Sequence, residues 1–227
     1  RQLTVYTPHD YAADQGPYPV VLIFDRMSYS TSVPTRVILD NLIAAHKIPP
    51  SVAVLIDNVE GQRGIELPCN PEFARLLATE LVPWVRQNYA VTTDPALTVI
   101  GGSSYGGLAA SYAAFMHPEI FGNVLSQSGS YWWSADWSYA DPDPEVEGEW
   151  LTRQYALSEH KPIRFYMDVG LHEGSEPSMR VVNRHFRDVL EARGYEIVRY
   201  VEFNGGHEYV NWRGTLSDGL IALLGQQ

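Results

Sequence analysis

The sequence predicts an α/β protein in which a doubly wound, mostly parallel sheet lies in a three-layer sandwich between helices. Patterns typical of buried strands alternate with helical patterns along the whole chain, and such alternation favours parallel strands joined by right-handed crossovers. The apolar runs at 19–25 and 52–56 are continuous, as in strands that are covered on both faces. The 227 residues show no repeat, linker or low-complexity tract, so residues 1–227 are expected to form a single domain.

The first half of the chain is expected to supply three strands and two helices. Leu3 and Val5 alternate with polar residues, which predicts an edge-like strand, and apolar positions at helical spacing predict the first helix. Asn70 and Pro71 form a helix start with a capping side chain and a proline at the first helical position, and Pro83 is expected to kink this helix. The expected elements are a strand at 2–6, a strand at 19–25, a loop at 26–32, a helix at 33–46, a strand at 52–56, a loop at 57–70 and a helix at 70–89.

The second half repeats the alternation of strands and helices. Gly194 is expected to close the longest helix of this half. The expected elements are strands at 97–100, 123–127, 163–169 and 196–203, and helices at 108–116, 145–157, 176–193 and 209–224.

Composition and charge exclude several classes of function. The formal net charge is -11 and no basic run occurs, which argues against nucleic acid and anionic membrane surfaces as partners. No apolar stretch is long enough to span a membrane, and the single cysteine, Cys69, excludes an internal disulfide framework. Phosphate-cradle and zinc-binding motifs are absent, so neither a cofactor nor a metal is expected. Without a recognisable leader at its start, the chain is expected in the cytoplasm.

The segment around Ser104 predicts a nucleophile elbow. A β-branched strand ends at paired glycines, the G-x-S-x-G pattern follows at 102–106, and a small, apolar helix comes next. In such a turn the central serine is held in a strained conformation, and Gly102 and Gly106 are expected at positions where a Cβ atom would collide. Ser104 is therefore the predicted nucleophile, and the backbone N–H of Tyr105 is the first predicted oxyanion donor. This motif specifies the α/β-hydrolase version of the fold.

An acid and then a histidine are expected to follow the nucleophile in chain order. His207 lies in a glycine-rich loop directly after the last predicted strand, whereas the competing His172 lies where the acid is expected. Glu173 follows the strand at 163–169 and could reach the imidazole, and Asp168, still within that strand, is the alternative. The predicted triad is thus Ser104, Glu173 and His207, with the choice between Glu173 and Asp168 left open.

The remaining site residues come from loops at the carboxyl ends of strands, where sites form in such sheets. The second oxyanion donor is expected from the backbone N–H of Arg26, with Met27 as the alternate.

An aromatic block is either buried packing or the wall of an apolar cleft, and it consists of Tyr131, Trp132, Trp133, Trp137 and Tyr139. Arg63 and Glu66 form either a structural ion pair beneath the cleft or a substrate handle.

Four segments carry a resemblance to a known family. They are Glu66-Leu-Pro-Cys-Asn70, the elbow at 101–108, Leu125-Ser-Gln-Ser-Gly-Ser-Tyr-Trp-Trp133 and Gly205-Gly-His-Glu-Tyr-Val-Asn-Trp-Arg213. On these segments the chain resembles, over nearly its whole length, the esterase D-like group of putative esterases among the α/β hydrolases. Within that group it is similar to the enterochelin esterases, which hydrolyse ferric catecholate siderophore trilactones.

The resemblance implies Ser104 as nucleophile, His207 as base and Glu173 as acid. It implies that Arg63 and Glu66 contact substrate, and Trp132, Trp133 and Trp212 are added as candidate substrate contacts. The enterochelin esterases of the cytoplasm carry an extra amino-terminal domain that this sequence lacks, and the net charge of -11 opposes a polyanionic ferric complex.

Three functions are compatible with these residues. The first is a serine esterase that forms an acyl-enzyme, with a siderophore trilactone or another ester, such as a carbohydrate, feruloyl or acetyl ester, as its small-molecule substrate. The second is an acyltransferase of the same fold. The third is a siderophore-binding relative without catalysis, which the intact Ser104, Glu173 and His207 set argues against.

Overall fold

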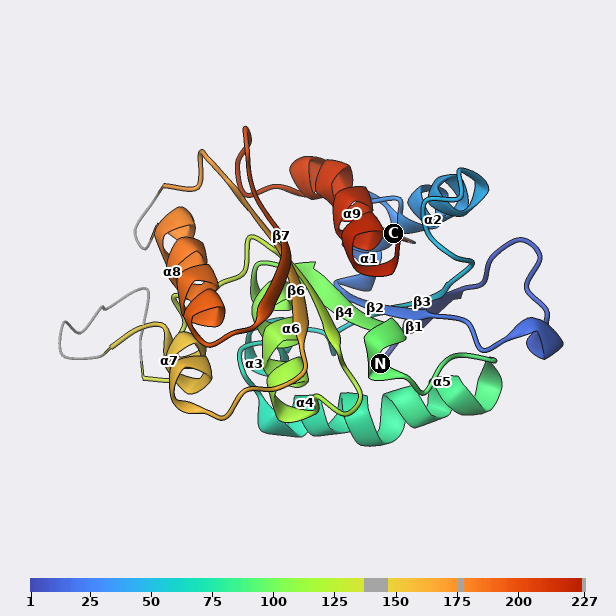
Figure 1. Ribbon diagram of the computed structural model, residues 1–227, viewed down its shortest axis with the longest axis horizontal. Helices are drawn as coiled ribbons and strands as arrows, with labels where there is room; N and C mark the ends of the chain where they lie inside the picture. Colours follow the sequence, from blue (N-terminus) through green and yellow to red (C-terminus); the bar gives the residue numbers. More distant parts are fainter. Residues whose placement is uncertain (137–146, 175–177, 226–227) are drawn as a thin grey trace.

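The computed structural model describes residues 1–136, 147–174 and 178–225, which form a central sheet with helices on both faces (Figure 1). The order of strands across the sheet is β1-β3-β2-β4-β5-β6-β7, and the pairs are parallel apart from β1 with β3. The prediction of a doubly wound, mostly parallel sheet in three layers is therefore confirmed. The strands are β1 (Leu3–Tyr6), β2 (Val20–Phe24), β3 (Val52–Ile56), β4 (Thr98–Ser103), β5 (Asn123–Gln127), β6 (Arg164–Gly170) and β7 (Glu196–Phe203).

Two apolar cores, one on each face, explain the continuous hydrophobic runs. Val20, Leu22 and Phe24 of β2 enter one core, whereas Val21 and Ile23 enter the other. Because successive side chains of a strand point to opposite faces, a strand covered on both sides needs apolar residues throughout. One face is covered by α1 (Arg26–Ser30), α2 (Thr35–Ala44) and α9 (Tyr209–Leu224). The other is covered by α4 (Pro71–Leu76), η2 (Leu77–Leu81), α5 (Val82–Asn88), α6 (Tyr105–Met116), α7 (Trp150–Leu157) and α8 (Met179–Ala192).

The sequence patterns miss two short helices. The expected loop at 26–32 contains α1, which begins after Asp25 turns the chain in a left-handed conformation with φ 58°. Its Tyr29 is fully buried and donates a hydrogen bond of 2.7 Å to Gln127 Oε1, so burial of one aromatic side chain holds this turn of helix against the sheet. The loop expected at 57–70 likewise contains α3 (Arg63–Glu66), and the shortest helical turns, η1 (Ala13–Gln15) and η3 (Pro95–Leu97), lie in other connections.

The helix expected from Asn70 to about Tyr89 is present as α4, η2 and α5 in succession. The Asn70 side chain accepts the Phe73 N–H at 3.0 Å, as the capping pattern predicts. The distortion expected at Pro83 takes the form of the π-helical turn η2. Proline lacks an N–H and its ring crowds the carbonyl four residues earlier, and a widened turn accommodates both.

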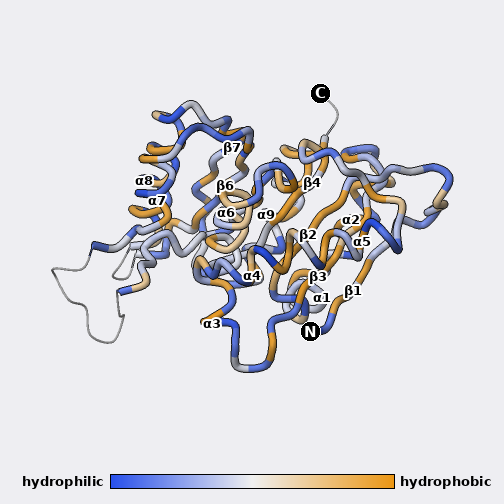
Figure 2. The backbone as a smooth tube through the Cα atoms, turned by 90° about the horizontal axis from the view of Figure 1, so that it is seen from below, coloured by the Kyte–Doolittle hydropathy of each residue, from blue (hydrophilic) through white to orange (hydrophobic). Residues whose placement is uncertain are grey.

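The other helices differ from their predicted bounds mainly at their starts. α6 begins at Tyr105, directly after the elbow, and not at Leu108. Gly194 follows α8 with φ +81°, which is the helix-closing conformation that the sequence predicts. Figure 2 shows the alternating hydropathy along α8, whose apolar side faces the core. The predicted helix starts at 145 and 176 lie outside the described residues.

The strand order places a topological switch point between β2 and β4. From β2 the chain moves outward to β3 on one side, and it then returns to form β4 on the other side. In sheets of this kind the crevice outside the carboxyl ends of the strands at the switch point binds ligands. Asp25 and Arg26 leave β2 at this crevice, and Ser104 leaves β4 there.

Candidate active site

Ser104 occupies a strained backbone conformation at the end of β4. Its dihedral angles are φ 58° and ψ -121°, a region that residues with side chains rarely adopt. Two backbone hydrogen bonds hold it there, because its N–H donates to the Gln127 carbonyl at 2.9 Å and its carbonyl accepts the Ser130 N–H at 3.1 Å. The strand β5 and the loop after it therefore fix the elbow from one side.

The glycines around Ser104 contribute unequally. A Cβ atom at Gly102 would lie 3.1 Å from Gly106 Cα, so this close approach does require glycine. The expectation that Gly106 is crowded is wrong, because the nearest atom outside its own helix, Phe24 Cβ, would be 3.6 Å away. The position that has no room for a side chain is instead Gly107, where a Cβ atom would lie 2.6 Å from Ser126 Oγ. The first turn of α6 thus packs directly on β5.

Two helix starts meet at the switch point and offer backbone amides there. Tyr105 is the first residue of α6 and Arg26 is the first residue of α1, and each follows a residue with φ 58°. The first N–H groups of a helix have no partner within it and carry the positive end of its dipole. The predicted donors, Tyr105 N–H and Arg26 N–H, therefore belong to the kind of amide that binds an oxyanion.

Glu173 and His207 are joined at the ends of β6 and β7. Glu173 Oε2 lies 2.7 Å from His207 Nδ1, the Glu173 side chain is buried, and the imidazole is 38% exposed. Because a carboxylate only accepts, this contact places the proton on Nδ1 and leaves Nε2 as an acceptor. The second Glu173 oxygen, Oε1, accepts hydrogen bonds from the Ser128 hydroxyl at 2.7 Å and the Gly170 N–H at 2.8 Å.

The Ser104 hydroxyl is hydrogen-bonded to the Ser130 hydroxyl, at 3.1 Å. Among the described residues no hydrogen bond joins Ser104 to His207. Catalytic hydrogen bonds are often long or misaligned before substrate binds, so the absence of this bond does not exclude the pair. Ser130 itself is buried beside Ser104.

Asp168, the alternative acid, lies within β6 and is fully buried. Neither of its carboxyl oxygens has a hydrogen-bond partner among the described residues, and His207 is not near enough to bond to it. Burial raises the pKa of Asp168 to about 7, and the nearby hydroxyls of Thr215 and Tyr166 oppose that rise. Of the two carboxyl groups, the structure brings Glu173 to the histidine.

The polar residues expected to contact substrate have protein partners. Arg63 forms a two-pronged ion pair with the buried Asp25, with nitrogen–oxygen distances of 2.6 and 2.7 Å. Glu66 pairs with Arg1 at 2.8 Å and accepts a hydrogen bond from Asn58 Nδ2 at 2.8 Å. The hypothesis of an ion pair between Arg63 and Glu66 is therefore wrong, because each has a separate partner. The Arg26 side chain is similarly paired, with Asp57 at 2.9 Å.

The aromatic candidates fall into two groups. The Tyr105 ring centroid lies 5.9 Å from Arg63 Cζ and 5.7 Å from the centroid of the Trp132 ring. Both Trp132 and Trp133 are partly buried. Trp212 is instead 3% exposed and packs edge-on against the His207 ring with centroids 4.9 Å apart. Tyr131 is fully buried and belongs to the core. Trp137 and Tyr139 lie outside the described residues.

Asp25, Ser128 and Ser130 contact predicted site residues, but the sequence reasoning did not select them. Asp25 could have been found as the last residue of a buried strand at a carboxyl end. Ser128 and Ser130 follow β5 within the segment 125–133, which carries part of the family resemblance, and a cluster of small polar residues after a strand is the signal that could have selected them.

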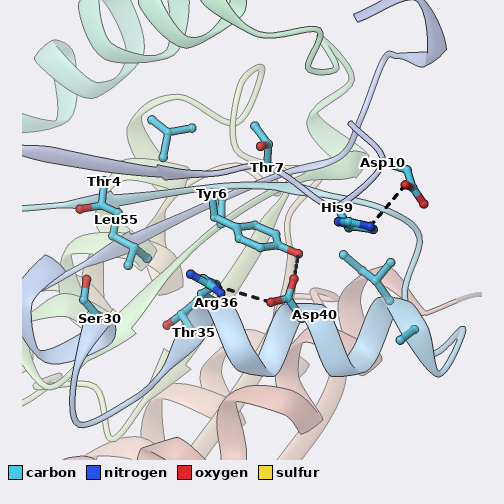
Figure 3. A pocket seen from close by; sticks show the side chains of 14 residues that line it. Thr4, Tyr6, Thr7, His9, Asp10, Ser30, Thr35, Arg36, Asp40 and Leu55 are labelled. Atoms are coloured by element: carbon cyan, nitrogen blue, oxygen red, sulfur yellow. Dashed lines mark hydrogen bonds and ion pairs between the residues drawn. The ribbon is translucent and has the colours of Figure 1, made fainter. Parts of the chain in front are cut away.

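A groove of about 850 Å³ lies elsewhere, along β1 and α2 (Figure 3). Tyr6 donates to Asp40 at 2.8 Å within it, and Arg36 lies 3.7 Å from the same carboxylate. None of Ser104, Glu173 and His207 lines this groove. It is therefore separate from the candidate active site.

The described part of the chain lacks two kinds of feature. No cluster of three or more histidine, cysteine, aspartate or glutamate side chains is arranged there to hold a metal ion. No helix in the described ranges combines the length and apolar character that crossing a bilayer would require.

Comparisons with known proteins give consistent results. The family model described as Putative esterase matches residues 1–223. The chain is 34% identical over 225 residues to the iron(III) enterobactin esterase of Escherichia coli strain K12, covering 98% of this chain and 53% of that protein. It is 32% identical over 229 residues to the iron(III) enterobactin esterase of Dickeya dadantii, covering 99% and 52%.

Among solved structures, the enterobactin esterase of Shigella flexneri in the presence of enterobactin matches with a TM-score of 0.83 at 32% identity. That alignment covers 97% of this chain and 54% of the other. The chain thus spans about half the length of these relatives.

Proposed function

The chain belongs to the Putative esterase family, and from this premise we propose that it is a serine hydrolase that cleaves carboxylic esters through an acyl-enzyme. The proposal is supported by three features that lie at the carboxyl ends of β2, β4, β6 and β7. These features are the strained Ser104, two helix-start amides and the Glu173–His207 pair. Each supplies one requirement of acyl transfer, namely a nucleophile, an oxyanion site and an oriented base.

The geometry leads to the following steps. The Ser104 side chain turns from Ser130 to His207 Nε2, which takes its proton as Ser104 Oγ attacks the ester carbonyl. The N–H groups of Tyr105 and Arg26 bind the oxyanion of the tetrahedral intermediate. His207 then gives its proton to the leaving alcohol, and the acyl-enzyme forms. In the second half of the reaction His207 takes a proton from water, which attacks the acyl carbonyl. His207 then returns the proton to Ser104 Oγ as the acyl–oxygen bond breaks and the acid leaves, while Glu173 holds the imidazole and stabilises its charged form.

We propose a catecholate siderophore trilactone as the substrate. Support comes from the names of the relatives, two of which are iron(III) enterobactin esterases more than 30% identical to this chain. The Tyr105 and Trp132 rings beside the elbow offer flat apolar surfaces for catechol rings, and Arg63 offers a cation above Tyr105. Trp133 and Glu66 remain proposed contacts at the margin of this surface.

The test is analysis of products by chromatography and mass spectrometry after incubation with iron-loaded and with iron-free enterobactin. p-Nitrophenyl acetate serves as a general ester, and an added alcohol acceptor reports acyl transfer. Ser104→Ala removes the nucleophile and is expected to lower the rate by at least about 10⁴-fold. Ser111→Ala, a change to a buried serine within α6, is the matched control and is expected to keep activity.

Serine-dependent release of linear dihydroxybenzoylserine units would support the siderophore substrate. Cleavage of the acetate ester with both trilactones intact would keep the hydrolase and reject the substrate. Transfer to the added alcohol in preference to water would favour an acyltransferase. Tight siderophore binding by the folded chain without turnover of any ester would reject the hydrolase in favour of a binding protein.

A further inference from the structure

Ser128 bonds to the oxygen of Glu173 that does not face the histidine. It follows β5 directly, is fully buried, and has a left-handed backbone with φ 48°. Its hydroxyl donates to Glu173 Oε1 at 2.7 Å, while Glu173 Oε2 faces His207 Nδ1 at 2.7 Å. A serine in this backbone region is strained, and such strain persists only where the surroundings enforce it. Here its N–H donates to the Asp168 carbonyl at 2.8 Å.

Trp212 fixes the direction of the Ser128 hydroxyl. Its Nε1–H donates to Ser128 Oγ at 3.1 Å, and an indole nitrogen can only donate. The Ser128 oxygen therefore accepts from Trp212, and its own hydrogen is directed to Glu173. The Trp212 ring also packs edge-on against the His207 ring, so the Trp212 side chain contacts both the Ser128 hydroxyl and the imidazole.

Trp212 is held in turn by the buried Gln127. Gln127 Nε2 donates to the Trp212 carbonyl at 2.9 Å and to Thr215 Oγ1 at 2.6 Å, and Gln127 Oε1 accepts from Tyr29 at 2.7 Å. These four side chains belong to α1, β5 and α9. A continuous set of hydrogen bonds thus runs from the helix that carries the Arg26 amide to the helix beside His207.

We infer that Ser128, oriented by Trp212, is a positioning residue that holds Glu173 with Oε2 against His207 Nδ1. This inference rests on the proposed function, in which Glu173 orients the catalytic base. It also assigns Trp212 to orienting Ser128 and packing against the His207 ring, and not to contact with the substrate. Without the Ser128 donor, Gly170 N–H alone holds Oε1, and the carboxylate can rotate about its side-chain torsions away from His207.

The experiment compares Ser128→Ala and Trp212→Phe with Ser126→Ala. Ser126 is the matched control because it is a buried serine of β5 that accepts one side-chain hydrogen bond, from Tyr131, and does not contact Glu173. Steady-state kinetics with p-nitrophenyl acetate give kcat and KM. One-dimensional proton NMR in water follows the low-field His207 Nδ1–H signal, which is assigned by its loss in His207→Gln.

Ser128→Ala is expected to lower kcat by about 10- to 100-fold, the effect of losing one hydrogen bond to a charged group, with KM nearly unchanged. The His207 signal is expected to shift or broaden in Ser128→Ala and Trp212→Phe, and to stay in place in Ser126→Ala. A kcat within twofold of the unmodified chain, with an unmoved signal, would overturn the inference. A rise in KM alone in Trp212→Phe would instead return Trp212 to the substrate surface.

The two proposals fail in different ways. If the unmodified chain hydrolyses no ester, the proposed function fails, whereas the NMR signal still reports whether Ser128 holds the Glu173–His207 contact. If esters are cleaved but the three variants give the same kinetics and spectra as the unmodified chain, only the positioning role fails. Circular dichroism of each variant separates both outcomes from misfolding.

Discussion

Asp168 and Glu173 are buried carboxyl groups on the same strand and its following loop, and their surroundings differ sharply. Glu173 accepts hydrogen bonds from His207, Ser128 and Gly170. Both oxygens of Asp168 lack a hydrogen bond within the described chain, and burial raises its pKa to about 7. Burial makes the charged form of Asp168 costly, and the nearby Thr215 and Tyr166 hydroxyls offset only part of that cost. This carboxyl group therefore holds its proton more tightly in the folded protein than in the unfolded chain.

Asp168→Asn is expected to stabilise the protein at pH 8 more than at pH 5. The pKa of Asp168 in the folded protein, about 7, lies above the ordinary value of an aspartate, 3.8. The stability that comes from this group is therefore fully present below about pH 4 and is lost as the pH rises through 7. Asparagine removes that loss, with a gain on the order of 4 kcal/mol at pH 8 and on the order of 2 kcal/mol at pH 5.

Urea unfolding at the two pH values measures this difference. An equal gain, or an equal loss, at pH 5 and pH 8 would contradict the raised pKa. Because Asp168 does not contact His207, kcat at pH 8 is expected to stay within a few-fold of the unmodified chain. A collapse of kcat in Asp168→Asn would return Asp168 to the position of candidate acid.

At the scale of elements, short turns of helix at strand ends shape the candidate site. α1 and α6 each begin directly after a residue with φ 58°, and both helices start at the switch point between β2 and β4. The elbow depends on how closely α6 approaches β5. That approach is set at Gly107, where a Cβ atom would lie 3.1 Å from Gly129 Cα as well as 2.6 Å from Ser126 Oγ.

Gly107→Ala is therefore expected to destabilise the protein by about 1 to 3 kcal/mol, the usual cost of overpacking a core. Gly106→Ala is the neighbouring control, because its Cβ atom would make only ordinary contacts at 3.6 Å and alanine favours the helix. Thermal unfolding of both variants measures the contrast. Equal melting temperatures for the two variants would show that α6 can move off β5 without cost.

At the scale of the whole molecule, net charge opposes the proposed substrate. The chain carries a formal net charge of -11, and Arg26 and Arg63, the arginines at the start of α1 and α3, are paired with Asp57 and Asp25. A polyanionic ferric complex is therefore repelled at a distance and attracted only at short range. Salt weakens the long-range repulsion more than the buried pairs.

Raising the ionic strength from about 0.01 to 0.15 M is expected to increase kcat/KM for ferric enterobactin by several-fold, since the Debye length falls from about 30 to 8 Å. The neutral p-nitrophenyl acetate is the internal control and is expected to show little change. A fall in kcat/KM for the ferric complex would mean that cations gather at the site entrance and attract it.

The sequence by itself determined the layered fold and most of the candidate site. Continuous apolar runs identify β2 and β3, because a strand covered on both faces cannot alternate. The G-x-S-x-G spacing, with a strand before it and a helix after it, identifies Ser104. The positions of Glu173 and His207 after their strands follow from chain order. All these signals are local, since each depends on residues within one turn or strand.

Only the tertiary structure decided which side chains meet. The contacts of Glu173 with Ser128, of Arg63 with Asp25 and of Ser104 with Ser130 join segments that are distant in sequence. The same is true of α1, whose short sequence has no helical periodicity and is held by the burial of Tyr29 under β5. Periodicity and spacing report how a segment faces a core, whereas partner choice depends on strand order and register, which no single segment encodes.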